Sequence, residues 1–497
     1  MHAANGTRGH SFCVWRAIES QRGVKGYRRD RLLTPCEWPY YSMGQFASIS
    51  GDAATNCACF LSALGVAKIA ETCRRGHSWS RDSILWRQLF LQNMIGGKGS
   101  FIDCGIDWRR EYKDDFCWMT GEVVIEDCIP RTGTDSDLTD MVTSVVQLHK
   151  NRYFCGGHDG RVVEFDKNNC TDEQSTWLNN VFVTNEWIRS MTSVREDTLA
   201  LCVGNDLLYV RIEQAEALSA EMFSTLKGHT GPVHFTAPYN DTMCVSTSFD
   251  RTARLWDLPQ GVCTGVFHGH TEQLYGVMCS APYIVTASYD RSVRLFDNRD
   301  KCNGAQCTFQ GHNGPAWFVQ PCTEADLLSL TRFYSSSSDG IVREWDIRSP
   351  SRPSHIFPSM SCSSCNDFIV DHGHKRLVCG YDDGSVSVFS TTVAKERIHH
   401  DLMSARYIRK VGSFQSSARP RHKYFFGDSN GQISLVGSTE SVVDLPKPST
   451  FQKACDVHEL SGIRSMLCCE QENSVFYGTY DGHVKRLTVA HGGMQKS

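Results

Sequence analysis

Three segments in the middle of the chain have nearly the same sequence. Each begins with Gly-His and continues through a strand of small polar residues to an Asp. Each then closes with an alternating strand that ends in an aromatic residue and Asp. They read GHTGPVHF and STSFDRTARLWD (residues 228–235 and 246–257), GHTEQLYG and TASYDRSVRLFD (269–276 and 286–297), and GHNGPAWF and SSSDGIVREWD (311–318 and 336–346). A period of roughly 40–45 residues is typical of a protein built from repeated supersecondary units.

The local chemistry of each unit favours antiparallel strands. Ala-Arg-Leu-Trp and Val-Arg-Leu-Phe alternate in character, as a strand with one buried face does. The Asp followed by Arg or Gly predicts a tight turn between two strands. These features resemble the WD-repeat blades of a β-propeller.

In the WD-repeat family, the His, the turn Asp, a strand Ser or Thr and the Trp form a buried hydrogen-bonded network. The resemblance assigns this network to His229, Asp250, Trp256 and either Ser246 or Ser248. The equivalent residues in the next two units are His270, Asp290, His312, Asp339 and Trp345. A His–Asp–Ser trio is also the signature of a hydrolase. We expect a structural role, because buried polar groups must be paired and an unpaired one costs about 1–3 kcal/mol.

Eight such units can be counted from residue 121 onwards. The anchors are a turn residue and the hydrophobic residue six positions later: Asp159/Phe165, Asp206/Ile212, Asp250/Trp256, Asp290/Phe296, Asp339/Trp345, Asp383/Phe389, Asn430/Val436 and Asp481/Leu487. The second and seventh units match the pattern weakly. The sequence therefore predicts a mainly β chain with an eight-bladed propeller, and seven blades with one degenerate unit excluded is the alternative.

The outermost strand of the last unit is missing from the sequence after Leu487, where only a few polar residues follow. An open sheet edge is a liability, so another segment should supply that strand. We expect residues 121–127, GEVVIED, to pair with the last sheet because they alternate and directly precede the first unit.

Residues 60–90 resemble the second half of an F-box. The quoted matches are Leu64, Ile69, Cys73, Arg74, Trp79, Leu85, Trp86, Arg87, Leu89 and Phe90. The usual Leu-Pro start of the box is not legible in SMGQFASISGDAATNC. The resemblance implies a small α-helical domain that binds the ubiquitin-ligase adaptor through Leu64, Ile69, Cys73, Leu85, Trp86, Leu89 and Phe90. The alternative is a small helical cap on the propeller.

Five regions are expected along the chain. They are a basic, weakly ordered tail (1–42), the F-box-like helical domain (43–91), an aromatic-basic helical linker (92–120), the propeller (121–490) and a short tail (491–497).

Composition and motifs exclude several other classes. A net charge of −4 gives no global basic field for nucleic acid, and no apolar run is long enough to span a bilayer. The N-terminus has no apolar core of signal-peptide length, and the 23 cysteines have irregular spacings, so we expect reduced thiols in the cytoplasm or nucleus. His399-His400-Asp401 is a weak metal candidate. We expect no metal, cofactor or catalytic activity.

F-box receptors that resemble this chain bind their targets on the propeller face that carries the turn Asp residues. Two positions in each blade line that site: the residue after the apolar one that opens the innermost strand, and the residue before the turn Asp. The first set is Arg189, His234, Tyr275, Trp317, Arg409 and Arg464, and the second is Phe249, Tyr289, Tyr381 and Tyr480. Arg189 and Arg464 should lie near each other across the first blade and grip a phosphate or carboxylate. The alternative is that these arginines pair with nearby acids on the rim.

Two functions compete at this point. The first is a substrate receptor of a Skp–cullin–F-box ubiquitin ligase, whose partners are the adaptor, the cullin scaffold and an acidic or phosphorylated target protein. The second is a WD-repeat scaffold for complex assembly with no ubiquitin-ligase link. Neither predicts binding to nucleic acid or membranes.

Overall fold

A computed structural model describes most of the C-terminal three quarters of the chain. The described residues are 123–128, 141–149, 152–166, 179–184, 186–195, 197–212, 223–300, 304–392, 397–403, 406–414, 423–438, 451–458, 461–469 and 473–489. The chain divides into two units, Met1–Phe116 and Cys117–Ser497, and every described residue belongs to the second. The two expected tails, the F-box-like domain and the whole linker (92–120) therefore lie outside the described residues, as do all seven expected adaptor-binding residues.

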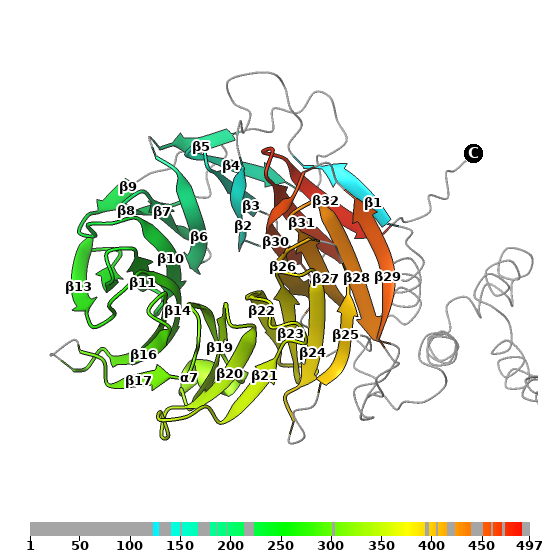
Figure 1. Ribbon diagram of the computed structural model, residues 1–497. Coiled ribbons are helices and arrows are strands. Elements are labelled where there is room, and N and C mark those ends of the chain that lie inside the picture. The colour runs from blue at the N-terminus through cyan, green and yellow to red at the C-terminus, as the bar shows by residue number, and fades with distance from the viewer. Residues whose placement is uncertain are drawn as a thin grey trace, which may run out of the picture. The chain divides into compact units, whose positions relative to one another are not determined.

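The second unit is a ring of eight four-stranded antiparallel sheets, the blades of a β-propeller (Figure 1). Blades 1 and 2 comprise β2 (Val142–His149), β3 (Arg152–Gly157), β4 (Arg161–Asp166), β5 (Asn179–Val183), β6 (Ile188–Arg195), β7 (Thr198–Val203), β8 (Asp206–Arg211) and β9 (Phe223–Leu226). Blades 3 and 4 comprise β10 (Val233–Pro238), β11 (Met243–Ser248), β12 (Ala253–Asp257), β13 (Val262–Phe267), β14 (Leu274–Ser280), β15 (Tyr283–Ser288), β16 (Ser292–Asp297) and β17 (Cys307–Gln310).

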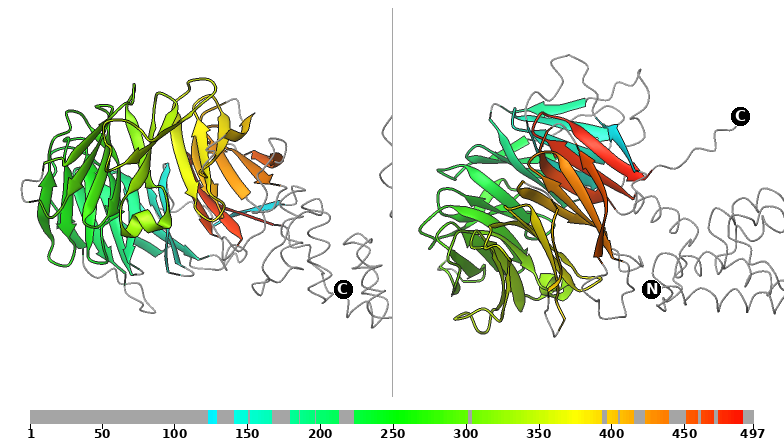
Figure 2. Two further views of the ribbon diagram at one scale, coloured as in Figure 1. Left: turned by 90° about the horizontal axis from the view of Figure 1, so that it is seen from below. Right: turned by 45° about the vertical axis from the view of Figure 1, so that its right-hand side comes forward.

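The remaining four blades follow the same plan. Blades 5 and 6 comprise β18 (Ala316–Pro321), β19 (Arg332–Ser337), β20 (Ile341–Asp346), β21 (His355–Pro358), β22 (Cys365–Asp371), β23 (Arg376–Tyr381), β24 (Ser385–Ser390) and β25 (Arg397–Leu402). A short helix, α7 (Glu324–Leu328), lies between β18 and β19 (Figure 2). Blades 7 and 8 comprise β26 (Ile408–Ser413), β27 (Lys423–Asp428), β28 (Gln432–Ser438), β29 (Phe451–His458), β30 (Ile463–Cys469), β31 (Ser474–Thr479), β32 (Val484–Val489) and β1 (Val123–Asp127).

The prediction of eight blades is confirmed, and the two weak units both form complete sheets. One turn lies slightly off its predicted place. In blade 2 the turn is made by Gly204, at φ +53°, and Asn205, while Asp206 already belongs to β8 and pairs with Val203. A two-residue turn between these strands is shorter than the Asp-centred turns elsewhere, which explains the weak match of this unit.

The small polar residues of the repeat lie in the second strand of each blade, where there is little space. Five of six residues in β11, β15 and β19 are buried, because a neighbouring blade covers each face of the sheet. The apolar core accordingly lies between blades, with one cluster in each of the eight gaps. The ring is therefore stabilised mainly by blade-to-blade packing.

β1 closes the ring by pairing antiparallel with β32, so the prediction for residues 121–127 is confirmed (Figure 1). The register places Val123 opposite Val489, Glu126 opposite Arg486 and Asp127 opposite Lys485. Two ion pairs follow this register: Arg486 Nη1 lies 3.7 Å from Glu126 Oε2, and Lys485 Nζ lies 3.8 Å from Asp127 Oδ1. The charge pattern thus specifies the register of the closing strand.

Candidate functional site

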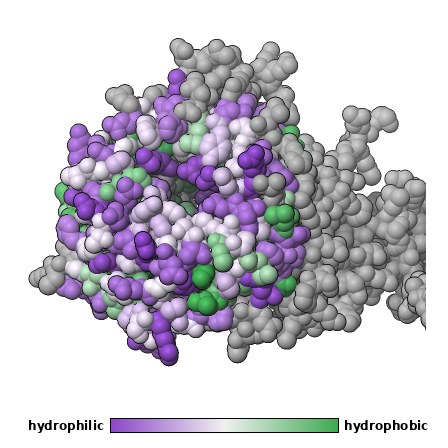
Figure 3. All heavy atoms as spheres, viewed as in Figure 1, coloured by the Kyte–Doolittle hydropathy of each residue, from purple (hydrophilic) through white to green (hydrophobic). Residues whose placement is uncertain are grey.

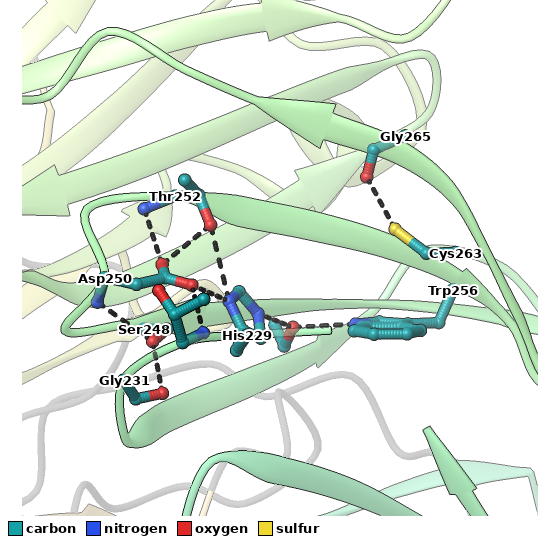
Figure 4. A network of polar contacts seen from close by, with 10 residues as sticks. His229, Gly231, Ser248, Asp250, Thr252, Trp256, Cys263 and Gly265 are labelled. Atoms are coloured by element: carbon teal, nitrogen blue, oxygen red, sulfur yellow. Dashed lines mark hydrogen bonds and ion pairs between the residues drawn. The ribbon is translucent and has the colours of Figure 1, made fainter. Parts of the chain in front are cut away.

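Blade 3 contains a complete chain of buried polar contacts (Figure 4). Nδ1 of His229 lies 2.7 Å from Asp250 Oδ2, and its Nε2 lies 2.7 Å from Ser246 Oγ. The indole Nε1 of Trp256 donates to the same Ser246 Oγ at 2.8 Å. Of the two serines considered from the sequence, Ser246 is the one in the network, because Ser248 donates to the carbonyl of Gly231.

Blades 4 and 5 contain variants of this chain. His270 bridges Asp290 and Thr286 at 2.7 and 2.8 Å, and Phe296 occupies the place of the tryptophan. In blade 5, Ser335 contacts both His312 Nε2 and Trp345 Nε1 at 2.7 Å. There Arg343 donates to His312 Nδ1 and to Asp339 Oδ2, so His312 and Asp339 stand 3.6 Å apart.

These trios have no access for a substrate. The side chain of Ser246 is fully buried, His229 is 6% exposed, and the hydroxyl is already engaged by two partners. A nucleophile must reach its substrate, so the Ser246–His229–Asp250 geometry serves the fold. Burial raises the pKa of the Asp250 carboxyl, but hydrogen bonds from His229 and Thr252 outweigh this and lower it below its ordinary value.

Three arginines occupy equivalent positions at the start of innermost strands in blades 2, 7 and 8. Arg189, Arg409 and Arg464, here called the arginine cluster, each follow a buried isoleucine: Ile188, Ile408 and Ile463. The isoleucines are locked against glycines of the preceding blade. A Cβ on Gly380 would lie 2.5 Å from Ile408 Cγ2, and one on Gly427 would lie 2.8 Å from Ile463 Cγ2. Close packing of neighbouring blades therefore fixes the backbone position from which each arginine side chain extends.

The three arginines influence one another electrostatically. Burial lowers the pKa of Arg464, and the charges of Arg409 and Arg189 lower it further. Among the described residues, none of the three arginines has an ion pair, and Nε of Arg409 is buried without a hydrogen-bond partner. Asp367 interacts electrostatically with Arg464 but is paired with Lys410 at 3.5 Å. The rim ion pairs of the alternative are not present among the described residues.

Aromatic side chains continue the site across blades 3 to 5. His234, Phe249, Tyr275, Tyr289 and Trp317, here called the aromatic arc, contact one another with ring centroids 4.7 to 6.2 Å apart. The guanidinium of Arg189 lies 5.3 Å from the Phe249 ring and joins the arc to the arginine cluster. One face of the propeller thus combines arginines that have no ion pair among the described residues with the apolar surface of aromatic side chains. Figure 3 shows a central hollow in the propeller bordered largely by hydrophilic residues.

Three further aromatic residues stand beside the arginine cluster. Trp187 lies 4.9 Å from the Arg189 guanidinium, and Tyr407 lies 5.4 Å from that of Arg409. Tyr480 acts electrostatically on Arg464, and its Cδ2 would lie 2.9 Å from a Cβ on Gly462. We call Trp187, Tyr407 and Tyr480 the aromatic collar; they are 50%, 46% and 37% exposed.

The expected target-binding residues are brought together on this face with one correction. Arg189, His234, Tyr275, Tyr289, Trp317, Arg409, Arg464 and Tyr480 all belong to the arginine cluster, the arc or the collar. Tyr381 does not, because it is fully buried in the core between blades 5 and 6. The residue that directly precedes the turn Asp383 is Asp382, which accepts a hydrogen bond from Asn366.

Sequence reasoning missed Trp187 and Tyr407, which precede the opening hydrophobic residue. The repeated tripeptide aromatic-Ile-Arg at 187–189 and 407–409 is the signal that could have found them.

Burial of His234 predicts that the propeller loses stability in mild acid. Burial lowers the pKa of His234 to about 4; a hydrogen bond with the Tyr275 carbonyl opposes this, and the charges of Arg189, Arg464 and Lys410 add to it. Between pH 6.5 and about 4 the unfolded chain binds a proton that the folded chain does not, so stability falls as pH falls. We expect the free energy of unfolding in urea to drop by about 2 kcal/mol from pH 7 to pH 5 on this account. The variant His234→Phe should flatten that slope, and an unchanged slope would contradict the assignment.

Comparison with known proteins agrees with this architecture. The sequence family described as WD domain, G-beta repeat, matches residues 221–257 and 261–297. The chain contains WD40 repeats. A guanine nucleotide-binding protein subunit beta from Nicotiana tabacum is 27% identical over 45% of this chain and 57% of its own length. Cell division control protein 4 from Saccharomyces cerevisiae is 28% identical over 26% of this chain and 18% of its own length. The chain thus matches little more than half of one of these relatives and a fifth of the other.

One solved structure has a similar fold. The crystal structure of the computationally designed Ika8 protein superposes with a TM-score of 0.57 over 73% of this chain and all of that one, at 15% identity. At that identity the likeness concerns the fold alone.

No three His, Cys, Asp or Glu side chains in the described part of the chain are arranged to hold a metal ion, and this covers His399, His400 and Asp401. No helix in the same residues is long and apolar enough to cross a membrane.

Proposed function

We propose that this chain is the target-binding subunit of a Skp–cullin–F-box ubiquitin ligase. In this proposal the propeller binds an acidic or phosphorylated protein segment at the arginine cluster and aromatic arc. The observation that carries it is a set of three arginines that form no ion pair with any described residue, next to a continuous aromatic surface. Guanidinium groups donate bidentate hydrogen bonds to phosphate and carboxylate, and desolvated aromatic rings are the usual anchors of a protein interface.

Such a subunit performs no chemistry of its own. Its F-box-like segment would dock on the adaptor, and the propeller would hold the target so that target lysines reach a high local concentration near the charged ubiquitin carrier. The adaptor half of the proposal is supported by the resemblance of residues 60–90, which lie outside the described residues. The alternative is a WD40 scaffold that binds the same kind of segment without a ligase.

Two double variants of the tagged full-length chain separate these functions. Trp86→Ala with Leu89→Ala should remove the adaptor and cullin from a pull-down while bound target remains. Arg189→Ala with Arg464→Ala should weaken target binding about a hundredfold and leave the adaptor bound, because several charge-assisted hydrogen bonds are lost.

The matched control is Arg299→Ala with Arg348→Ala, which removes the same charge from exposed arginines paired with Asp297 and Asp346. This variant should bind both partners. A wild-type chain that retains target but never adaptor would favour the scaffold. Unchanged target binding in a folded Arg189/Arg464 variant would exclude this face.

A further inference from the structure

The aromatic collar lies beside the arginine cluster and is partly exposed to solvent. Trp187, Tyr407 and Tyr480 are 37–50% exposed, whereas each arginine beside them is mostly covered. Burial is the main cause of the lowered pKa of Arg464, and Nε of Arg409 has no solvent access and no partner in the described part of the chain. A group that pairs with these guanidiniums therefore lies close to exposed aromatic rings.

The three collar residues come from two different kinds of position in their blades. In blades 2 and 7 the ring comes from the residue two positions before the arginine, Trp187 and Tyr407. In blade 8 that position is Gly462, and the ring comes instead from Tyr480 on the adjoining turn, held by the hydrogen bond from its backbone N to Gly462 O at 3.0 Å. Different segments thus place an exposed ring beside each cluster arginine.

A ligand for such a site carries its negative charge at the end of a long, flat, apolar side chain. We infer that the arginine cluster and aromatic collar select phosphotyrosine over phosphoserine, phosphothreonine and acidic residues in the bound segment. The phenyl ring of the ligand packs against a collar ring in an offset-stacked or edge-to-face arrangement. Its phosphate oxygens accept hydrogen bonds from the neighbouring guanidiniums. Phosphoserine carries its phosphate on a single methylene and leaves the collar uncovered.

This inference rests on the proposed function and specifies its ligand. Its test uses the full-length chain and three probes: N-acetyl-O-phosphotyrosine amide, N-acetyl-O-phosphoserine amide and inorganic phosphate. Calorimetric titration should show the phosphotyrosine probe binding about tenfold tighter than the phosphoserine probe, which is the expected contribution of one stacked ring.

Variants assign the preference to particular residues. Trp187→Leu with Tyr480→Leu should bring the two amino-acid probes to within about twofold of each other and leave inorganic phosphate unchanged. Trp187→Phe with Tyr480→Phe should keep the preference, because the rings remain. Arg464→Gln should weaken all three probes, and the control Arg348→Gln should weaken none, because Arg348 is exposed and paired with Asp346.

The possible outcomes are distinguishable. Equal affinity for both amino-acid probes, with binding still dependent on Arg464, overturns the inference and leaves the proposed anion site standing. Absence of binding by all three probes overturns both. Tight binding of a single-stranded oligothymidylate that is lost in the collar and Arg464 variants, without a phosphotyrosine preference, would assign the face to nucleic acid and overturn the inference as well.

Discussion

Replacing Ser246 by Ala is expected to lower the free energy of unfolding by about 3 kcal/mol, although it removes one atom. The hydroxyl accepts from Trp256 Nε1 at 2.8 Å and contacts His229 Nε2 at 2.7 Å, and all three side chains are buried. His229 donates from Nδ1 to Asp250, so its Nε2 accepts the proton of Ser246. The variant leaves one donor and one acceptor without partners, each at a cost of about 1–3 kcal/mol. Urea unfolding followed by tryptophan fluorescence measures the loss.

Thr286→Val in blade 4 is the matched control. Thr286 is equally buried and bridges to His270 Nε2 at 2.8 Å, but Phe296 offers no second donor. Valine keeps the shape of threonine, so one group loses its partner and we expect roughly half the loss seen for Ser246→Ala. Equal losses in the two variants would mean that the tryptophan bond contributes nothing.

The polar network of the repeat could be predicted from the sequence in its general form but not in the variant found in blade 5. A recurring His, turn Asp and strand hydroxyl predict the network, since each residue type occurs at a fixed spacing and has few other buried partners. The insertion of Arg343 between His312 and Asp339 could not be predicted in this way. An arginine at that strand position, as at Arg254 and Arg294, has several directions to point, and only packing decides among them.

The candidate site was predictable where backbone register decides it. The buried hydrophobic residue that opens each innermost strand can be recognised in the sequence, and the residue after it is the second of the strand. This rule identified Arg189, Arg409 and Arg464. The prediction of Tyr381 was wrong because blade 6 has two consecutive aspartates, and the residue before the second is Asp382. The absence of rim ion pairs in the described part of the chain could not be predicted, since it depends on side chains from three different blades.

Loss of β1 is expected to have the second large effect, because this strand alone completes blade 8. Replacing Val123–Asp127 by five Gly and Ser residues in the full chain disrupts the ladder along β32 from Val489 to Lys485. With about 0.5–1.5 kcal/mol for each backbone hydrogen bond lost, the unfolding free energy should fall by about 3 kcal/mol or more. The uncovered edge of β32 should also promote self-association. Thermal unfolding with light scattering records both effects.

Charge reversal provides a graded version of the same experiment. Glu126→Lys with Asp127→Lys places like charges directly opposite Arg486 and Lys485, which destabilises an antiparallel pair by about 0.2–1 kcal/mol per site. Adding Arg486→Glu and Lys485→Glu restores opposite charges in the same register and should recover most of the loss. Recovery requires that β1 and β32 be neighbours in solution, so a quadruple variant no more stable than the double would show that another segment closes the ring.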